Sequence, residues 1–524
     1  MPQPGEPLGA VEELTGVTGR QLQAGAAKGA LWTAIHTVVS LPVALLTNIV
    51  VARLLGVAEF GSLAVLTTIQ GIAVAALGLG SGAALVQFGS KWFAAGRVAP
   101  TEHLVSRVQG LQILVTMPLL TIVYLAIADL PPWGLAVLLV LGVAAPTTIG
   151  VALDCLLIEN RSAAAARITM VVSLASQGVI IVVAVWARQS DAVWASRVAF
   201  SGLVVLSAAL VIAPGFRRAL RHPRWPRKMP AGFWKFAVTS MVSGLVSMLV
   251  MSRTEVFVLD RFRTTAEVGI FALAFGLSAH VFAPAQAIVN PLVPAISAIH
   301  ELSAAGRVER AFLRTMRTAS TASGFLVAVA MPAVAILVPT IYGHSFASAA
   351  PVVMGLGAAG GIALLTGPTS TFILARLAAA AILKATVAAL VLNVGLALVL
   401  VPLWGVWGAV VANIAGALGL TALMLWLEVG QLEVSWSLVV RSISPSLAGA
   451  GVGCAVFVLG RQIPSPMLGW LVAAVVGAVV YVGVLRVSRT GLTSDDAKAL
   501  VEALPRRLQR AAGSSMRLVT AVRQ

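Results

Sequence analysis

Long apolar stretches separated by short polar ones follow one another along the chain from residue 31 to residue 486. A helix needs about 20 apolar residues to cross the hydrocarbon core of a bilayer. The pattern predicts fourteen such helices, at 31–52, 62–87, 108–128, 133–157, 164–187, 193–214, 236–258, 268–296, 317–340, 350–374, 377–400, 404–427, 440–460 and 467–486. We therefore expect an all-α polytopic membrane protein with about 14 transmembrane helices.

The composition supports this fold class. Of the 524 residues, 59% are hydrophobic and only 10% are charged, whereas a soluble domain carries about 25% charged residues. An ordinary soluble enzyme is therefore excluded, because its cores could not hide so much apolar surface. The two cysteines, Cys155 and Cys454, lie in apolar stretches and give no disulfide framework. Residues 1–30 have no apolar core of a signal peptide, and we expect them to form a cytoplasmic tail.

The distribution of Lys and Arg along the chain predicts which side of the membrane each loop faces. The chain has 36 basic and 19 acidic residues, a net charge of +17. If the N-terminus is cytoplasmic, the fourteen spans place 29 Lys and Arg on the cytoplasmic side and seven on the outer side. Those seven are Arg53, Arg188, Arg197, Arg253, Arg261, Arg263 and Arg461. This bias predicts that both termini face the cytoplasm, and the basic charge needs no nucleic-acid partner.

Two basic segments flank the predicted bundles. The linker 215–235 carries Arg217, Arg218, Arg221, Arg224, Arg227 and Lys228. We interpret it as a topology anchor at the anionic inner leaflet rather than a specific partner site. The tail 487–524 has Asp495 and Asp496 at an expected helix start, followed by Arg506, Arg507 and Arg510. This pattern predicts a basic amphipathic helix on the cytoplasmic face.

An internal repeat relates the first and seventh predicted spans. Residues 50–64 match residues 258–272 at a constant offset of 208. The identities are Val50/Val258, Arg53/Arg261, Ala58/Ala266, Glu59/Glu267, Gly61/Gly269 and Ala64/Ala272. Both copies follow an odd-numbered span, so they point the same way. The repeat predicts six-helix bundles at 31–214 and 236–427 related by a parallel pseudo-repeat, plus an extra helix pair at 428–486, as in alternating-access transporters.

Three segments resemble the polysaccharide-exporting (Wzx-type) flippases of the MOP superfamily, which also contains the lipid II flippases and the MATE antiporters. The first is Lys28-Gly29-Ala30-Leu31-Trp32 running into Ala52-Arg53-Leu54-Leu55-Gly56 and Glu59-Phe60-Gly61. The second is Asp260-Arg261-Phe262 with Glu267-Val268-Gly269-Ile270-Phe271-Ala272. The third is Asn393 followed by Val401-Pro402-Leu403-Trp404-Gly405-Val406-Trp407-Gly408-Ala409. These motifs are structural turns, so they indicate the family better than the substrate.

The resemblance implies a flippase, not an enzyme, that moves undecaprenyl-diphosphate-linked oligosaccharide from the inner to the outer leaflet of a bacterial cytoplasmic membrane. A cation gradient or the membrane potential usually drives such a flippase. The implied partners are the lipid-linked glycan, the bilayer and a polysaccharide polymerase or glycosyltransferase. No cofactor is expected, and no Walker A, HExxH, CxxC or GxSxG motif stands in the sequence. No cation site of the family can be matched residue by residue.

Span one carries the first candidates for binding the anionic head group. Thr33, His36, Ser40 and Thr47 lie near one helical face. Such a stripe either lines a cavity or bonds a neighbouring helix, and we favour the cavity because an unpaired histidine is costly to bury. Asn48 and Arg53 stand at the outer end of the same span.

Span seven carries Arg253, Glu255, Asp260 and Arg261. Arginine suits a diphosphate because it binds in a bidentate manner. Arg253 is either such a ligand or a snorkelling residue at the outer interface, and Glu255 could pair with it. Span eight adds Gln286 and Asn290 among prolines that permit bending.

Asp154 in span four is the candidate for proton or cation coupling, with a plainer alternative in which it pairs with Arg161. Two further patterns concern the backbone. Thr366-Gly367-Pro368 predicts a break in span ten, and Gly78, Gly80 and Gly82 predict close helix packing rather than a phosphate loop.

Competing functions remain open. A MATE-type drug or metabolite antiporter shares the repeat architecture but favours a buried acidic residue in an early span, and span one has none. A lipid II-type precursor flippase differs only in its glycan. A membrane glycan polymerase or ligase needs a large outer loop, whereas the longest outer segment predicted here is about fifteen residues, 253–267. A lipid scaffold without transport is mildly opposed by the polar stripes.

Overall fold

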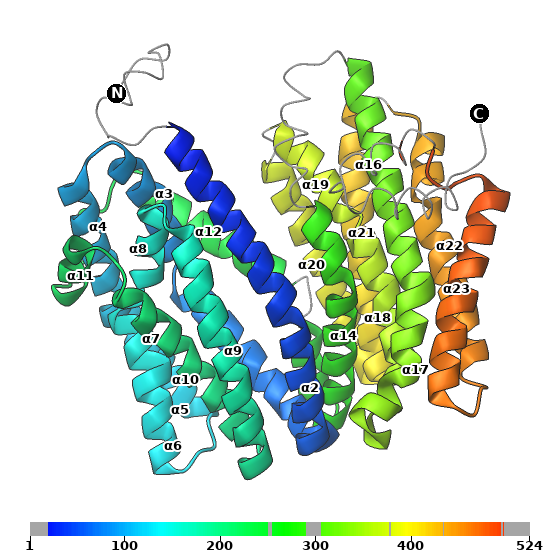
Figure 1. Cartoon of the computed structure of the whole chain (residues 1–524), viewed down its shortest axis with the longest axis horizontal. Helices are drawn as coiled ribbons and strands as arrows, with labels where there is room; N and C mark the ends of the chain where they lie inside the picture. Colours follow the sequence, from blue (N-terminus) through cyan, green and yellow to red (C-terminus); the bar gives the residue numbers. More distant parts are fainter. Residues whose placement is uncertain are drawn as a thin grey trace. The chain divides into compact units, whose positions relative to one another are not determined.

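A computed structural model describes residues 19–249, 254–289, 305–376, 379–432, 434–493 and 496 (Figure 1). Over these residues the chain is helical and forms no extended strand. It divides into two compact units, Met1–Met248 and Leu249–Gln524. The all-α class is confirmed.

The first unit contains one very long helix and a set of shorter ones (Figure 1). Its helices are α2 (Gly19–Leu77), α3 (Ser81–Ala94), α4 (Val98–Leu111), α5 (Met117–Ile127), α6 (Pro132–Val137), α7 (Ala145–Thr148), α8 (Ala152–Ile158), α9 (Ser162–Ala187), α10 (Ser190–Ala209), α11 (Pro214–Arg221) and α12 (Phe233–Met248), with π-helical turns η1 (Gln112–Thr116) and η2 (Leu138–Ala144).

The second unit consists mostly of long helices. They are α13 (Thr254–Phe262), α14 (Thr265–Val289), α16 (Ala305–Phe325), α17 (Met331–Tyr342), α18 (Ala349–Ala363), α19 (Thr366–Ala375), α20 (Ala379–Trp404), α21 (Val406–Leu432), α22 (Trp436–Gly460) and α23 (Pro466–Ser488), with the π-helical turn η4 (Leu326–Ala330) and the 3₁₀ turn η5 (His344–Phe346).

The described part of the chain has 12 helices that are long and apolar enough to cross a membrane. One of them, Leu31–Leu77, has 47 residues, but it consists of two helices joined at Gly56, where the backbone is not helical. It covers span one and most of span two. The predicted span seven divides between α12 and α13, and each of these helices is too short to be counted as a membrane-spanning helix. The multi-pass class is therefore confirmed, and the number 14 stays a prediction.

Gly56 divides α2 into two helices. Its backbone is non-helical, with φ 76° and ψ 177°, in a region that strongly favours glycine. The helix therefore changes direction at Gly56, inside the Leu-Leu-Gly part of the repeated motif. The two segments on either side of the bend match the first two predicted spans.

A π-helical turn recurs at equivalent places in the two units. The turn η1 precedes Met117-Pro118 in the third predicted span, and η4 precedes Met331-Pro332 in the ninth. Proline clashes with the carbonyl four residues before it, and a π turn widens the backbone there. The internal repeat is therefore visible in the backbone as well as in the loop motif.

The repeated glutamate performs the same task in each unit. Glu59 Oε2 accepts a hydrogen bond from the Ser190 backbone N–H at 2.9 Å, at the first residue of α10. Glu267 Oε2 accepts one from the Val406 backbone N–H at 2.9 Å, at the first residue of α21. Each carboxylate caps the N-terminus of the sixth helix of its bundle, where unpaired N–H groups and the helix dipole favour an anion.

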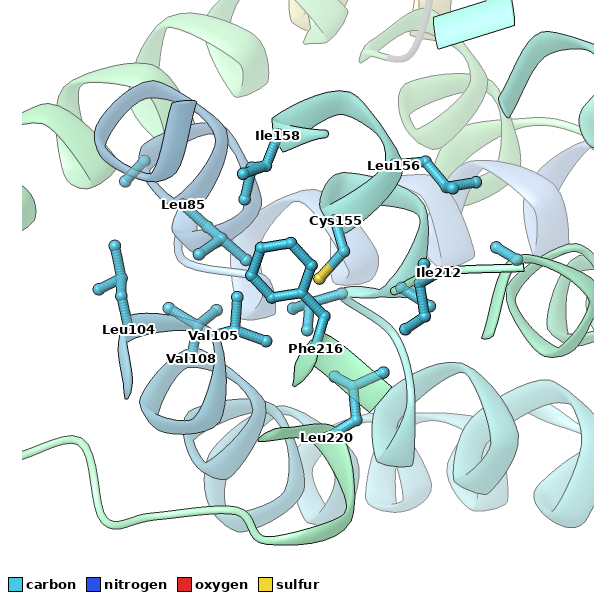
Figure 2. Packing of buried hydrophobic residues seen from close by; sticks show 14 of the residues in the cluster. Leu85, Leu104, Val105, Val108, Cys155, Leu156, Ile158, Ile212, Phe216 and Leu220 are labelled. Atoms are coloured by element: carbon cyan, nitrogen blue, oxygen red, sulfur yellow. The ribbon is translucent and has the colours of Figure 1, made fainter. Parts of the chain in front are cut away.

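The basic linker is folded onto the first unit. Phe216 and Leu220 of α11 are buried in an apolar cluster with Val105, Val108 and Cys155 from α4 and α8 (Figure 2). Ser106 Oγ donates a hydrogen bond to the His222 carbonyl, and Arg107 Nη1 donates one to the Lys228 carbonyl at 2.6 Å. The apolar face of α11 therefore packs on protein, while Arg218, Arg221, Arg227 and Lys228 stay exposed.

The C-terminal helix pair is an integral part of the second unit. A Cβ atom added at Gly449 of α22 would lie 2.3 Å from the Gly324 carbonyl oxygen of α16. Tyr481 of α23 is buried and its hydroxyl donates to the Thr321 carbonyl at 3.0 Å. At the end of the described chain, the Asp496 carboxylate pairs with Arg314 at 3.0 Å and Arg317 at 3.2 Å, both on α16.

Candidate functional site

A buried carboxylate lies between three helices of the second unit. Glu255 of α13 is fully buried, with 0% exposure. Its Oε1 atom accepts hydrogen bonds from Asn393 Nδ2 of α20 at 2.8 Å and from Asn413 Nδ2 of α21 at 2.7 Å. Asn393 Nδ2 also donates to the Ala412 carbonyl at 3.1 Å. These three side chains form what we call the Glu255 cluster.

The tight turn between α20 and α21 brings the two asparagines together. Gly405 joins the helices with φ +57°, and a Cβ at Gly408 would lie 2.2 Å from the Leu400 carbonyl oxygen. A Cβ at Gly416 would lie 3.0 Å from Asn393. Glycine is therefore needed for the turn and for the close approach of the two helices. The result is a helical hairpin that holds both amides against α13.

The Glu255 cluster leaves two oxygen acceptors without partners. Glu255 Oε2 and Asn393 Oδ1 are buried and accept no hydrogen bond from the residues that the structure describes. Both amide nitrogens are already donating to Glu255 Oε1. A buried carboxylate is costly unless its charge is compensated. The arrangement can therefore hold a proton or a small cation, because either would satisfy oxygen atoms to which the described residues supply no donor.

The first unit has a polar pair at the corresponding place. Arg197 Nη2 of α10 donates to Asn48 Oδ1 of α2 at 3.3 Å. One turn before Arg197 along α10, Trp194 Nε1 donates to Gln70 Oε1 at 2.9 Å. Asn48 was a predicted site residue, but Arg197 was not, because it was counted among the charges of an outer loop. Its position within the apolar stretch of α10 and on the same face as Trp194 is the signal that could have identified it.

The predicted polar stripe of span one lies on the first part of α2, which packs along α9. His36 Nε2 and Ser40 Oγ are buried and have no hydrogen-bond partner among the described residues. Thr47 is buried, and its hydroxyl donates to the Val43 carbonyl of its own helix at 3.0 Å. The hydroxyl of Thr47 is thus occupied, and a cavity beside His36 and Ser40 stays a prediction.

Asp154 lies against α3 and not beside Arg161. A Cβ added at Gly82 would be 3.0 Å from Asp154 Oδ2. Arg161 instead pairs with Glu159 at 2.9 Å and donates to the Val211 carbonyl at 2.9 Å. The alternative pairing of Asp154 with Arg161 is therefore wrong, since Glu159 is nearer along the chain and takes its place. A coupling role for Asp154 stays a prediction.

Gly80 behaves as predicted. A Cβ at Gly80 would lie 2.0 Å from the Ala237 carbonyl oxygen of α12, and Gly80 has φ +64°. Gly80 therefore serves close helix packing, whereas a Cβ at Gly78 would meet only the Val74 carbonyl of its own chain segment. The break predicted at Thr366-Gly367-Pro368 is not seen, because these residues belong to α19 and the two residues between α18 and α19 keep right-handed helical dihedrals.

The remaining predicted residues do not join these clusters in the described structure. Asp260 and Arg261 are exposed at the end of α13, where Arg261 lies 6.0 Å from the ring of Phe262. Arg53 is exposed near the Gly56 bend. Gln286 belongs to α14, but its side chain is not described. Arg253 and Asn290 lie outside the described residues, and so does the predicted pairing of Arg253 with Glu255.

A second buried charge in the second unit was missed by the sequence analysis. Arg376, which follows α19, forms an ion pair with Glu428 of α21. The Glu428 side chain is 1% exposed and that of Arg376 is 20% exposed. The two residues are 52 positions apart, so no local pattern could join them. This pair fixes the end of α21 against α19.

Comparison with solved structures identifies the architecture. The lipid II flippase MurJ in an inward closed conformation aligns with a TM-score of 0.63 and 12% identity, covering 86% of this chain and 97% of that chain. An inward-facing multidrug resistance MATE family transporter of the MOP superfamily aligns with a TM-score of 0.55 and 16% identity, covering 75% of this chain and 94% of that chain. Among curated proteins, none matches the sequence.

The chain thus has the fold of the MOP-superfamily transporters, as its repeat and motifs predicted. A family model described as polysaccharide biosynthesis protein matches residues 26–300, which is more than half of the chain. That range begins before the first apolar helix and includes both copies of the repeated Ala-Glu-x-Gly motif. The chain is therefore a multi-pass membrane protein that belongs to the polysaccharide biosynthesis protein family.

Proposed function

We propose that the protein is a flippase that moves polyprenyl-diphosphate-linked oligosaccharide from the inner to the outer leaflet by alternating access. The cargo is suggested by the family, whose description concerns polysaccharide biosynthesis. Its natural setting would be a bacterial cytoplasmic membrane with both chain termini inside, as the distribution of Lys and Arg favours. A polymerase or glycosyltransferase would act on the same glycan.

The single observation that carries the transport mechanism is the Glu255 cluster. A carboxylate that is fully buried in a membrane-spanning bundle is by default a functional group. One of its oxygens is held in place by two amides, and the described part of the chain supplies no donor to the other. Glu255 is therefore suited to exchange a proton or a monovalent cation during the cycle. Such exchange would let an ion gradient drive the cargo, and we assign the coupling role to Glu255 ahead of Asp154.

An antiporter of the MATE type is the second candidate, because a buried acidic residue at the head of a repeat also suits a cationic drug. The two functions differ in the charge of the cargo. The flippase handles an anionic diphosphate, whereas the antiporter handles small compounds that are often cationic. An assay that follows both kinds of molecule separates the candidates.

The test uses cells that make a lipid-linked oligosaccharide and that carry this chain. The leaflet distribution of that lipid is measured with the wild-type chain, with Glu255→Gln and with Glu309→Gln, a half-buried glutamate of α16 that serves as the matched control. We expect the lipid to accumulate in the inner leaflet with Glu255→Gln and not with Glu309→Gln. An unchanged lipid distribution in cells without the chain, together with retention of cationic compounds, would establish the antiporter instead.

A further inference from the structure

The polar contacts of the two units lie at similar positions relative to the residues that the two glutamates cap. In the first unit, Arg197 follows the capped residue Ser190 by seven positions, and Asn48 precedes Glu59 by eleven. In the second unit, Asn413 follows Val406 by seven positions, and Glu255 precedes Glu267 by twelve. Seven residues correspond to about 10 Å along a helix. Each unit therefore carries a polar contact between its first and sixth helices at the same depth below the capped turn.

The two contacts have opposite chemistry. In the Glu255 cluster, both amide nitrogens donate to one carboxylate oxygen, and the described residues supply no donor to Glu255 Oε2 or Asn393 Oδ1. In the first unit, the Asn48 amide oxygen accepts a hydrogen bond from the Arg197 guanidinium. The groups left over there are the Asn48 amide N–H₂ and the remaining guanidinium N–H groups, which are all donors. The contact in the first unit can thus donate hydrogen bonds to a ligand, whereas the Glu255 cluster can accept them.

The position of Arg197 requires an explanation. It lies on the same face of α10 as Val193 and Trp194, which are both fully buried. Its guanidinium contacts Asn48 of α2 inside the first unit, and Arg197 is half-buried. The described residues place no carboxylate within ion-pair distance of its guanidinium. A charge in this environment is costly and marks a binding function by default.

We infer that Arg197 and Asn48 form an anion site that binds the phosphate groups of a prenyl diphosphate. A guanidinium binds phosphate oxygens in a bidentate manner, and the adjacent amide adds a further donor in a fixed position. The inference rests on the proposed function, since that function supplies the diphosphate. It adds that the cargo is held by the first unit, whereas the ion that drives transport is held by the second.

The site is selective because its charged group is a cation, the guanidinium of Arg197, and the described residues place no carboxylate in an ion pair with it. An uncharged prenol has no negative oxygens for the guanidinium and gains little from the site. A phospholipid has one phosphate, shielded by its glycerol substituents, whereas a prenyl diphosphate has a terminal phosphate with three free oxygens. The same chemistry could still come from the bilayer, so the test must compare the two kinds of anion directly.

The test measures binding to the purified full-length chain in a neutral detergent. The probes are farnesyl diphosphate, farnesol and phosphatidylglycerol. We expect Arg197→Gln to weaken farnesyl diphosphate binding by at least about tenfold, and Arg197→Lys to have an intermediate effect because it keeps the charge but loses the bidentate geometry. Arg461→Gln, which changes an exposed arginine, should leave the affinity for farnesyl diphosphate unchanged. The affinity for farnesol should be the same in all variants.

A second variant separates binding from folding. Asn48→Asp is nearly isosteric and supplies Arg197 with its own carboxylate. It should raise the melting temperature while it abolishes farnesyl diphosphate binding, because the internal carboxylate replaces the ligand. A purely structural role for Arg197 predicts the opposite pattern, with stability and binding falling together in Arg197→Gln and binding retained in Asn48→Asp.

The outcomes distinguish a failure of the anion site from a failure of the proposed function. Wild-type affinity for farnesyl diphosphate in Arg197→Gln would overturn the site, even if the chain still translocates lipid-linked oligosaccharide. An equal loss of phosphatidylglycerol binding would overturn the assignment to cargo and make it a site for bilayer lipid. If the export assay fails but the Arg197-dependent affinity remains, the proposed function falls and the anion site stands.

Discussion

The Glu59 carboxylate accepts a hydrogen bond from the backbone N–H of Ser190 at 2.9 Å, across 131 residues of sequence. Glu267, its equivalent in the repeat, accepts one from Val406 at the same distance. The repeated motif therefore joins the turn before the second helix of each bundle to the start of the sixth. This link sets the depth at which Asn48 meets Arg197 and at which Glu255 meets Asn413.

Removal of either cap should destabilise the protein. Glu59→Ala and Glu267→Ala each leave a helix N-terminus without its acceptor, which costs about 0.5–2 kcal/mol. Thermal unfolding in detergent should show a lower melting temperature for both. Glu59→Gln and Glu267→Gln, which keep an acceptor oxygen, should lose less, and Glu309→Ala should change little. Equal melting temperatures for Glu267→Ala and Glu309→Ala would show that the cap contributes nothing.

Gly56 and Gly178 give a matched pair of substitutions. A Cβ atom meets nothing within 4 Å at either position, but Gly56 has φ +76° while Gly178 lies within α9. We expect Gly56→Ala to destabilise by about 1–3 kcal/mol, because almost only glycine adopts a positive φ with ψ near 180°. Gly178→Ala should be neutral or stabilise by up to about 1 kcal/mol through helix propensity. Melting temperatures that shift in the same direction would contradict the bend at Gly56.

Gly449 and Gly451 test how closely the C-terminal pair is packed. Both lie in α22, but a Cβ at Gly449 would collide with the backbone of Gly324, whereas one at Gly451 meets nothing within 4 Å. Overpacking of this kind costs about 1–3 kcal/mol. Gly449→Ala should therefore lower the melting temperature and Gly451→Ala should not. If Gly449→Ala were as stable as Gly451→Ala, the helix pair would not be packed on α16 as described.

The buried pair of Arg376 and Glu428 should respond non-additively. Loss of one partner leaves an uncompensated buried charge and costs about 3–5 kcal/mol. Replacement of both by methionine should cost much less than the sum of the two single changes. A double-mutant cycle on unfolding in detergent measures this coupling. Additive effects of Arg376→Met and Glu428→Met would mean that the pair does not interact in the folded protein.

The sequence was sufficient for features that depend on local pattern. The apolar stretches predicted the helices, and the matches between Glu59 and Glu267 predicted the repeat that the caps and π turns confirm. The hydrogen-bond partners of the buried polar groups could not be predicted from the sequence. Asn413 is 158 residues from Glu255, and their contact depends on how the α20–α21 hairpin packs against α13. Packing between distant helices leaves no local pattern in the chain.

The sequence pattern predicted Arg197 in an outer loop because of an error in a helix boundary. The predicted sixth span began at residue 193, so an arginine at its start was counted as a loop charge. The structure begins α10 at Ser190, which moves Arg197 two turns into the helix. A shift of three residues in a helix boundary thus changed a topology signal into a candidate binding residue. Boundaries are the least certain part of such predictions because propensities change gradually at helix ends.

The most direct measurement of the central claim is translocation by the purified chain in liposomes. A polyprenyl-diphosphate-linked oligosaccharide is placed in one leaflet, a cation gradient is imposed, and the fraction of the lipid that reaches the other leaflet is followed over time. We predict rapid translocation by the wild-type chain and little by Glu255→Gln. If the lipid stays in its original leaflet with the wild-type chain while a small cationic compound is moved against its gradient, the chain is an antiporter and not a flippase.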